Sequence, residues 1–160
     1  MITANQLIVH AIGDYILQSD WMANQKTSRH LPCAVHAISY TLVFLLLTQS
    51  ILALLAICIT HFVIDRWRLA RYICWAKNWL APPAPVPGLY KGNLPPEGGV
   101  IEIIGWPTPV TSWRYANKPW SACSKTGYDP ARPDFHSVWL LIITDNILHI
   151  LINAAAIRWL

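Results

Sequence analysis

The stretch "LPCAVHAISYTLVFLLLTQSILALLAICITHFVI", residues 31–64, contains no Asp, Glu, Lys or Arg, and it decides the expected fold. As one continuous helix it would be ~50 Å long at about 1.5 Å per residue, whereas the hydrocarbon core of a bilayer is ~30 Å thick. We therefore interpret this stretch as two membrane-spanning helices joined by a turn at residues 48–50.

The composition of the whole chain agrees with a membrane protein. Only 12% of the 160 residues are charged, against roughly 25% in typical soluble domains. A second apolar run, residues 136–157, contains Asp145 as its one charged residue. The four cysteines are scattered and form no C-x-x-C motif, so neither a disulfide framework nor a zinc knuckle is indicated.

These patterns predict an all-α fold, an integral membrane four-helix bundle that forms a single membrane domain over residues 1–160. The four helices are expected at residues 2–21, 31–48, 50–80 and 136–160. A long inserted loop rich in Pro, Gly and Trp, residues 82–135, lies between the third and fourth helices. Within it, "VIEIIGW" (100–106) and "TSWRY" (111–115) flank "PTPV" and can pair as a small β-hairpin.

The positions of the cations predict the orientation of the bundle. Lys26 and Arg29 lie in the first connection, and further Lys and Arg residues follow the third span and fill the long loop, whereas the turn at 48–50 has none. Under the positive-inside rule the first connection and the 82–135 loop are cytoplasmic, and both termini lie outside the cytoplasm. Because membrane topology explains most of the net charge of +4, we expect no nucleic-acid partner.

Ionisable residues inside the predicted spans recur at one spacing. Three of the helices each carry a His and an Asp four residues apart, and residues at this spacing share a helix face. Helix-rise estimates place all of these residues between the cytoplasmic half and the midplane of the membrane. They are the pairs His10–Asp14, His61–Asp65 and Asp145–His149, together with the lone His36.

Three interpretations of this set remain open: a metal site, a network that only bonds the helices together, and a proton or ion pathway. A metal site explains why carboxylates and imidazoles occur together, because both ligate divalent cations. We expect zinc, manganese or iron, as one or two ions. The predicted metal ligands are all seven residues: His10, Asp14, His36, His61, Asp65, Asp145 and His149.

Other polar residues are candidates for catalysis and substrate binding. Asp14 or Asp65 can act as a general base. Gln18, Lys26, Arg66 and Arg68 are candidates for binding a phosphate or lipid headgroup. The alternatives are that Gln18 is an interfacial residue and that the cations only set the topology.

The motif "HAIGDYILQSDWMANQK" (10–26), followed by His36, "HFVID" (61–65) and "DNILH" (145–149), resembles a family of small bacterial and phage membrane proteins catalogued as a domain of unknown function. The family pattern is H-x-x-G-D-[FY]-x-x-Q with a following K, a lone H, H-x-x-x-D and D-Q-x-x-H. Asn146 departs from it, since the family often has Gln there. More distantly, the chain is similar to LexA-regulated inner-membrane proteins described as metal-dependent hydrolases.

The resemblance implies a metal-binding, multi-pass protein of the bacterial inner membrane. Together with the apolar surroundings, it leads us to expect a hydrolase that cleaves a phosphoester or other ester of a lipid-like substrate, with membrane lipid as its partner. One alternative is a non-enzymatic membrane effector, for instance phage-encoded, that binds a host membrane protein through the 82–135 loop. Another is an ion or proton pathway. The sequence indicates no oligomeric state.

Overall fold

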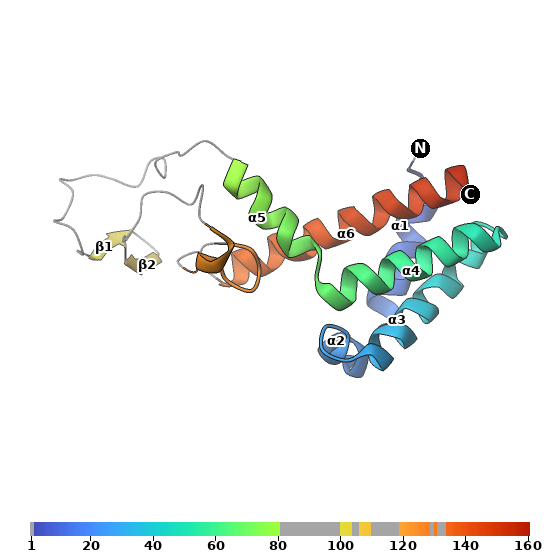
Figure 1. Cartoon of the computed structure of the whole chain (residues 1–160), viewed down its shortest axis with the longest axis horizontal. Coiled ribbons are helices and arrows are strands. Elements are labelled where there is room, and N and C mark those ends of the chain that lie inside the picture. Colours follow the sequence, from blue (N-terminus) through green and yellow to red (C-terminus); the bar gives the residue numbers. More distant parts are fainter. Residues whose placement is uncertain (1, 81–99, 104–105, 110–118, 129, 131–133) are drawn as a thin grey trace. The chain divides into compact units, whose positions relative to one another are not determined.

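The computed structural model describes residues 2–80, 100–103, 106–109, 119–128, 130 and 134–160. The chain divides into two compact units. The first, which we call the helical unit, comprises Met1–Ala70 and Ile142–Leu160, and the second comprises Arg71–Leu141. Figure 1 shows the order of the elements along the chain. All predicted site residues belong to the helical unit.

The first predicted helix, residues 2–21, is two helices rather than one. Helix α1, Ala4–Ala11, continues into a π-helical turn, η1, at Ile12–Ile16. Ser19 then adopts an extended conformation and caps a separate short helix, α2, at Asp20–Gln25. The prediction of one continuous helix is therefore wrong, because a serine at this position stabilises a new helix start by accepting a bond from a free backbone N–H.

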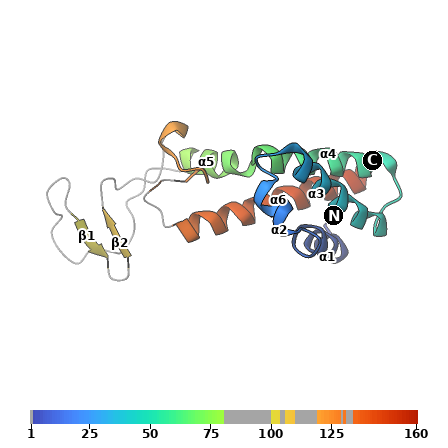
Figure 2. The ribbon, with the colours of Figure 1, turned by 90° about the horizontal axis from the view of Figure 1, so that it is seen from below.

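Helices α3 (His30–Val43) and α4 (Ile51–Trp67) form a helical hairpin and pack against each other. They run side by side in Figure 2. A short 3-10 turn, η2 (Phe44–Leu46), ends α3, and Ser50 caps α4 by accepting from the backbone N–H of Ala53. The predicted pair of helices joined at residues 48–50 is confirmed.

The third predicted helix, residues 50–80, is interrupted. Arg68 ends α4 in the left-handed conformation, with φ of 50°, and a new helix, α5, occupies Ala70–Leu80. A left-handed residue turns the chain away from the helix axis, so the single-helix prediction is wrong. The final helix, α6 (Asp134–Trp159), agrees with the prediction to within two residues at its start.

A small β-hairpin is present in the long loop. Strand β1 (Val100–Ile103) pairs antiparallel with β2 (Trp106–Pro109). The predicted partner strand at 111–115 lies outside the described residues. The second strand instead includes residues from the expected turn "PTPV", so the predicted position of the turn is wrong.

The helical unit has a polar interior and an apolar exterior. Its apolar core is small and consists of Val9, Tyr40, Phe44, Ile57 and Ala156. Beside this core lie buried polar side chains: Gln6, His10, Asp14, His36, Thr41, His61, Asp65, His149 and Asn153. Large apolar side chains are instead exposed along α3, α4 and α6, among them Leu42, Leu52, Leu55, Ile59, Ile147 and Leu151.

Helix α6 is the one helix among the described residues that is both long enough and apolar enough to cross a membrane. It has 26 residues, and 22% of its most apolar window is buried. Residues His30–Leu46 form a shorter apolar helix. The helical character of the unit is thus confirmed, and the four-span membrane bundle stays a prediction.

Candidate metal centre

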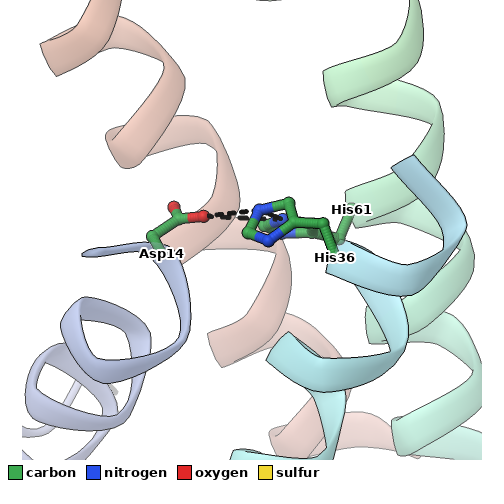
Figure 3. Close-up of side chains that lie close together, drawn as sticks. All are labelled: Asp14, His36 and His61. Atoms are coloured by element: carbon green, nitrogen blue, oxygen red, sulfur yellow. Dashed lines mark hydrogen bonds and ion pairs between the residues drawn. The ribbon is translucent and has the colours of Figure 1, made fainter. Parts of the chain in front are cut away.

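Asp14, His36 and His61 come from three different elements and meet at one point (Figure 3). The Oδ1 atom of Asp14 lies 3.1 Å from Nε2 of His36 and 3.5 Å from Nε2 of His61. The two Nε2 atoms lie 3.0 Å apart. All three residues are buried. This group, which we call the first triad, therefore turns three potential ligand atoms toward one another.

A second triad, formed by His61, Asp65 and His149, adjoins the first and shares His61 with it. Nε2 of His61 is 3.2 Å from Oδ2 of Asp65, and Nε2 of His149 is 3.5 Å from Oδ1 of the same carboxylate. The Oδ2 atom of Asp65 also lies 3.3 Å from Nε2 of His36. Asp65 thus contacts both imidazoles of the first triad through Oδ2 and contacts His149 through Oδ1.

These separations suit a metal ion. At metal–ligand distances of about 2.0–2.2 Å, neighbouring ligand atoms of a tetrahedral site lie roughly 3.3–3.6 Å apart. The ligand atoms of the first triad are 3.0–3.5 Å apart, so shifts of a few tenths of an ångström produce that geometry. In addition, Nε2 of His149 is buried without a hydrogen bond among the described residues. Both triads could hold a metal ion.

Ring packing fixes the orientation of the central histidine. The imidazole of His61 lies between two other rings, with centroid distances of 3.8 Å to Tyr40 and 4.1 Å to His149. The Nδ1 atoms of His36 and His61 have no hydrogen-bond partner within the part of the chain that the structure describes. Stacking, rather than an acceptor on Nδ1, therefore holds His61 in place.

The Tyr40 ring also contacts the π-turn. A Cβ atom built on Gly13 would lie 2.5 Å from Cδ2 of Tyr40. Any larger residue here would therefore require the Tyr40 ring to move. The "GD" of the first motif thus has two roles. The glycine leaves room for the Tyr40 ring, and the next residue, Asp14, points into the first triad.

The structure places His10 beside the two triads. Its Nδ1 lies 2.7 Å from the Tyr40 hydroxyl, and its Nε2 lies 2.8 Å from Oδ1 of Asn146. Because the Asn153 amide donates to the Tyr40 oxygen, the Tyr40 hydroxyl is free to donate to Nδ1 of His10. The imidazole proton of His10 is then on Nε2, and this nitrogen is also 3.6 Å from Oδ2 of Asp14. Both ring nitrogens of His10 are therefore engaged.

Asp145 also lies at the edge of the cluster. Its side chain is 25% exposed, and its Oδ2 lies 3.5 Å from Nε2 of His149. Of the seven predicted ligands, five form the triads, namely Asp14, His36, His61, Asp65 and His149, while His10 and Asp145 are neighbours. That these residues ligate a metal stays a prediction.

The predicted substrate-binding residues have different positions. Lys26 belongs to the cluster, since its Nζ lies 2.9 Å from Oδ2 of Asp65. Burial alone would lower the pKa of Lys26, but the carboxylates of Asp65 and Asp14 outweigh this effect and raise it above its ordinary value. The ammonium is therefore charged at neutral pH.

Among the described residues, the three remaining candidates form no hydrogen bond or ion pair with the triads. Arg66 donates to the backbone oxygen of Thr27 at 2.7 Å and to His30 at 3.3 Å, so it fixes the connection that carries Lys26. Arg68 ends α4. The Oε1 atom of Gln18 is buried without a hydrogen bond among the described residues.

Sequence reasoning missed Tyr40, whose hydroxyl bonds His10, and Asn153, whose amide donates to that hydroxyl. The missing signal was the same spacing of four, because Tyr40 follows His36 by four residues and Asn153 follows His149 by four. The prediction considered ionisable groups alone. Extending it to every side chain that forms hydrogen bonds would have included both residues.

Residues 2–80 match a protein family of unknown function. The family model is described as "Protein of unknown function (DUF3307)". The matched range contains both residues of the His10–Asp14 and His61–Asp65 pairs and ends before Asp145. The match agrees with the predicted resemblance to a family of unknown function, whereas the likeness to the LexA-regulated hydrolases stays a prediction. No curated protein and no solved structure matches the chain.

Proposed function

We propose that this protein is a membrane-embedded, metal-dependent hydrolase that cleaves a phosphoester or other ester of a lipid-like substrate. The observation that carries the proposal is the first triad. Its two imidazole nitrogens and one carboxylate oxygen lie within 3.5 Å of one another in a buried site. Exposed apolar helices surround this site.

The distribution of polarity supports the membrane location. Water-soluble domains rarely expose large contiguous apolar surfaces, and ionisable groups are seldom fully buried in them. Here the exposed faces of α3 and α4 are apolar, while the ionisable side chains lie inside. Helix α4 has 17 residues, at the short end of the about 17–25 residues that a membrane span needs.

The donor set supports hydrolytic chemistry. A divalent ion held here would supply Lewis acidity and would make a water molecule a stronger acid. Asp14 turns Oδ1 toward the imidazoles, and its Oδ2 lies on the side of His10. One oxygen can therefore hold the ion while the other accepts a proton, which is the role of a general base. Asp65 is less suited to this role, because its Oδ2 contacts Lys26 and its Oδ1 faces His149.

The surroundings of the site favour an amphiphile as substrate. A soluble substrate would have to cross the apolar exterior, whereas a lipid or polyprenyl phosphate can approach from within the bilayer. Lys26 is 17% exposed and is the cation that both borders the triads and reaches the surface of the described residues. It is suited to bind an anionic oxygen of such a substrate.

The test begins with elemental analysis of the detergent-purified protein. We expect zinc, manganese or iron bound to the folded chain and removable by a chelator. The loaded protein is then assayed for phosphate release from a polyprenyl phosphate and from phosphatidic acid in mixed micelles. Activity that disappears after chelation and returns with the metal would support the proposal, and metal-free protein with no metal uptake would refute it.

The same preparations separate the alternatives. Bound metal without turnover, together with loss of the cellular phenotype on deletion of residues 82–118, would favour a non-enzymatic membrane effector. Proton or ion flux into reconstituted vesicles would favour a pathway through the polar interior. For the hydrolase we expect no flux above that of empty vesicles.

A further inference from the structure

The two triads cannot each bind an ion at the same time, because they share one ligand atom. Both use Nε2 of His61. A neutral imidazole nitrogen has a single lone pair, which it directs to one metal ion. Occupation of the first triad therefore removes His61 from the second. What remains for a second ion is His149 and the Oδ1 atom of Asp65, with Asp145 at the edge.

A cation of the chain itself already lies beside the Asp65 carboxylate, on the side of His36. The ammonium of Lys26 lies 2.9 Å from Oδ2 of Asp65 and 3.4 Å from Nε2 of His36. The Asp65 carboxylate is 2% exposed. In a two-metal site a carboxylate commonly binds one cation through each oxygen, and here one of the two oxygens is paired with an ammonium.

The charges of the cluster also indicate a single divalent ion. The carboxylates of Asp14, Asp65 and Asp145 carry three negative charges when ionised, and Lys26 carries one positive charge. One divalent ion brings the sum to zero with neutral histidines. A second divalent ion would leave two positive charges uncompensated in a buried site, which is costly.

We propose that the centre takes one divalent ion and that Lys26 serves as its second cation. The inference rests on the metal centre proposed above and narrows its substrate. An ammonium beside the ion would bind an anionic oxygen, as a second metal does in two-metal phosphoester hydrolases. The substrate class is therefore an anionic phosphoester of a lipid-like alcohol rather than a neutral carboxylic ester.

The experiment measures zinc binding to the full-length chain in detergent. The protein is stripped with a chelator and titrated with Zn²⁺ against a chromogenic competitor, and inorganic phosphate binding to the zinc-loaded protein is measured separately. For wild type we expect one zinc per chain. For Lys26→Gln we expect one zinc bound at least about tenfold more tightly, because repulsion by the ammonium is removed. Phosphate should bind at least about tenfold more weakly to this variant.

Two further variants serve as controls. Lys26→Arg keeps a cation and should resemble wild type in zinc stoichiometry. Arg29→Gln removes an exposed cation of the same connection and should change neither affinity. If Lys26→Gln does not fold, Lys26→Met removes the same charge with an apolar side chain of similar length. The zinc stoichiometry of the wild-type protein can be measured whether or not any variant folds.

The outcomes distinguish this inference from the proposed function. Two zinc ions per wild-type chain would overturn the inference while leaving the metal centre in place. Weaker zinc binding or unchanged phosphate binding in Lys26→Gln would also overturn it. Failure of both wild type and Lys26→Gln to bind zinc, manganese or iron would refute the metal centre itself.

Discussion

Replacement of Gly13 by alanine tests the contact on which the position of His61 depends. In the interior of a helix this change ordinarily stabilises a protein by about 0.5–1 kcal/mol, because glycine loses more conformational freedom on folding. Here the added Cβ would lie 2.5 Å from Cδ2 of Tyr40. The ring cannot retreat freely, since its centroid is 3.8 Å from that of His61.

Overpacking of this kind costs about 1–3 kcal/mol. After subtracting the gain in helix propensity, we expect Gly13→Ala to lower the free energy of unfolding by up to about 2.5 kcal/mol. The displaced Tyr40 ring should also move His61, and the metal affinity should fall at least about tenfold. Both quantities are measured in one detergent preparation, by denaturant unfolding of the stripped protein and by competitive zinc titration.

The matched control is Ile16→Ala, one turn away on the same π-turn, where the side chain is 73% exposed. We expect this control to retain wild-type metal affinity. A Gly13→Ala protein that is more stable than wild type by about 0.5–1 kcal/mol, with unchanged affinity, would show that Tyr40 does not press on the π-turn. The reasoning about how His61 is positioned would then be refuted.

Three other predictions concern the Tyr40 hydroxyl, two of the carboxylates and the membrane topology. Tyr40→Phe leaves His10 and the Asn153 amide without their shared buried partner, so we expect a loss of about 2–4 kcal/mol in unfolding free energy; a loss under about 0.5 kcal/mol would argue against the bonds. Asp14→Asn should lower metal affinity at least about 100-fold and Asp145→Asn about tenfold, because the first is in a triad and the second is at the edge; equal metal content in wild type and both variants would mean that the cluster is structural. If both termini lie outside the cytoplasm, alkaline phosphatase fused to the C-terminus should be active and green fluorescent protein fused there should not fluoresce. The reverse result would invert the topology.

The members of the site could be predicted because helices impose a simple period. His61 and Asp65 are four apart on α4, and Asp145 and His149 are four apart on α6, so each pair shares a face whatever the surroundings are. The lack of charge in residues 31–64 likewise required two helices and a turn. These properties depend on local sequence alone.

The remaining details depend on contacts between segments that are distant in sequence. The π-turn between Ile12 and Ile16 closes with a bond from Leu17 N–H to the Ile12 oxygen at 3.0 Å, and this wider turn changes the direction in which the side chains point. His10 therefore contacts Tyr40 while Asp14 enters the first triad. The sequence shows the spacing of the pair, but the Tyr40 ring that fits against Gly13 belongs to another helix.

The end of α4 at Arg68 could not be predicted from the sequence either. The residues around it favour continued helix by composition, and a non-glycine residue with positive φ is uncommon. The bonds from its N–H to the oxygens of Asp65 and Ile64 close the helix end. Nothing in the neighbouring sequence, such as a glycine or proline, marks this position.

The stacking of His61 on two rings also gives this residue a proton magnetic resonance signal that reports on the metal centre. Protons above the face of an aromatic ring are shifted upfield by its ring current, and the imidazole of His61 is stacked on Tyr40 and on His149. Its carbon-bound protons should therefore resonate upfield of those of an unstacked imidazole. Rotation of His61 by even part of a turn would abolish that shift, so the alignment of the ligand can be followed in detergent without a label on the ion or the lipid.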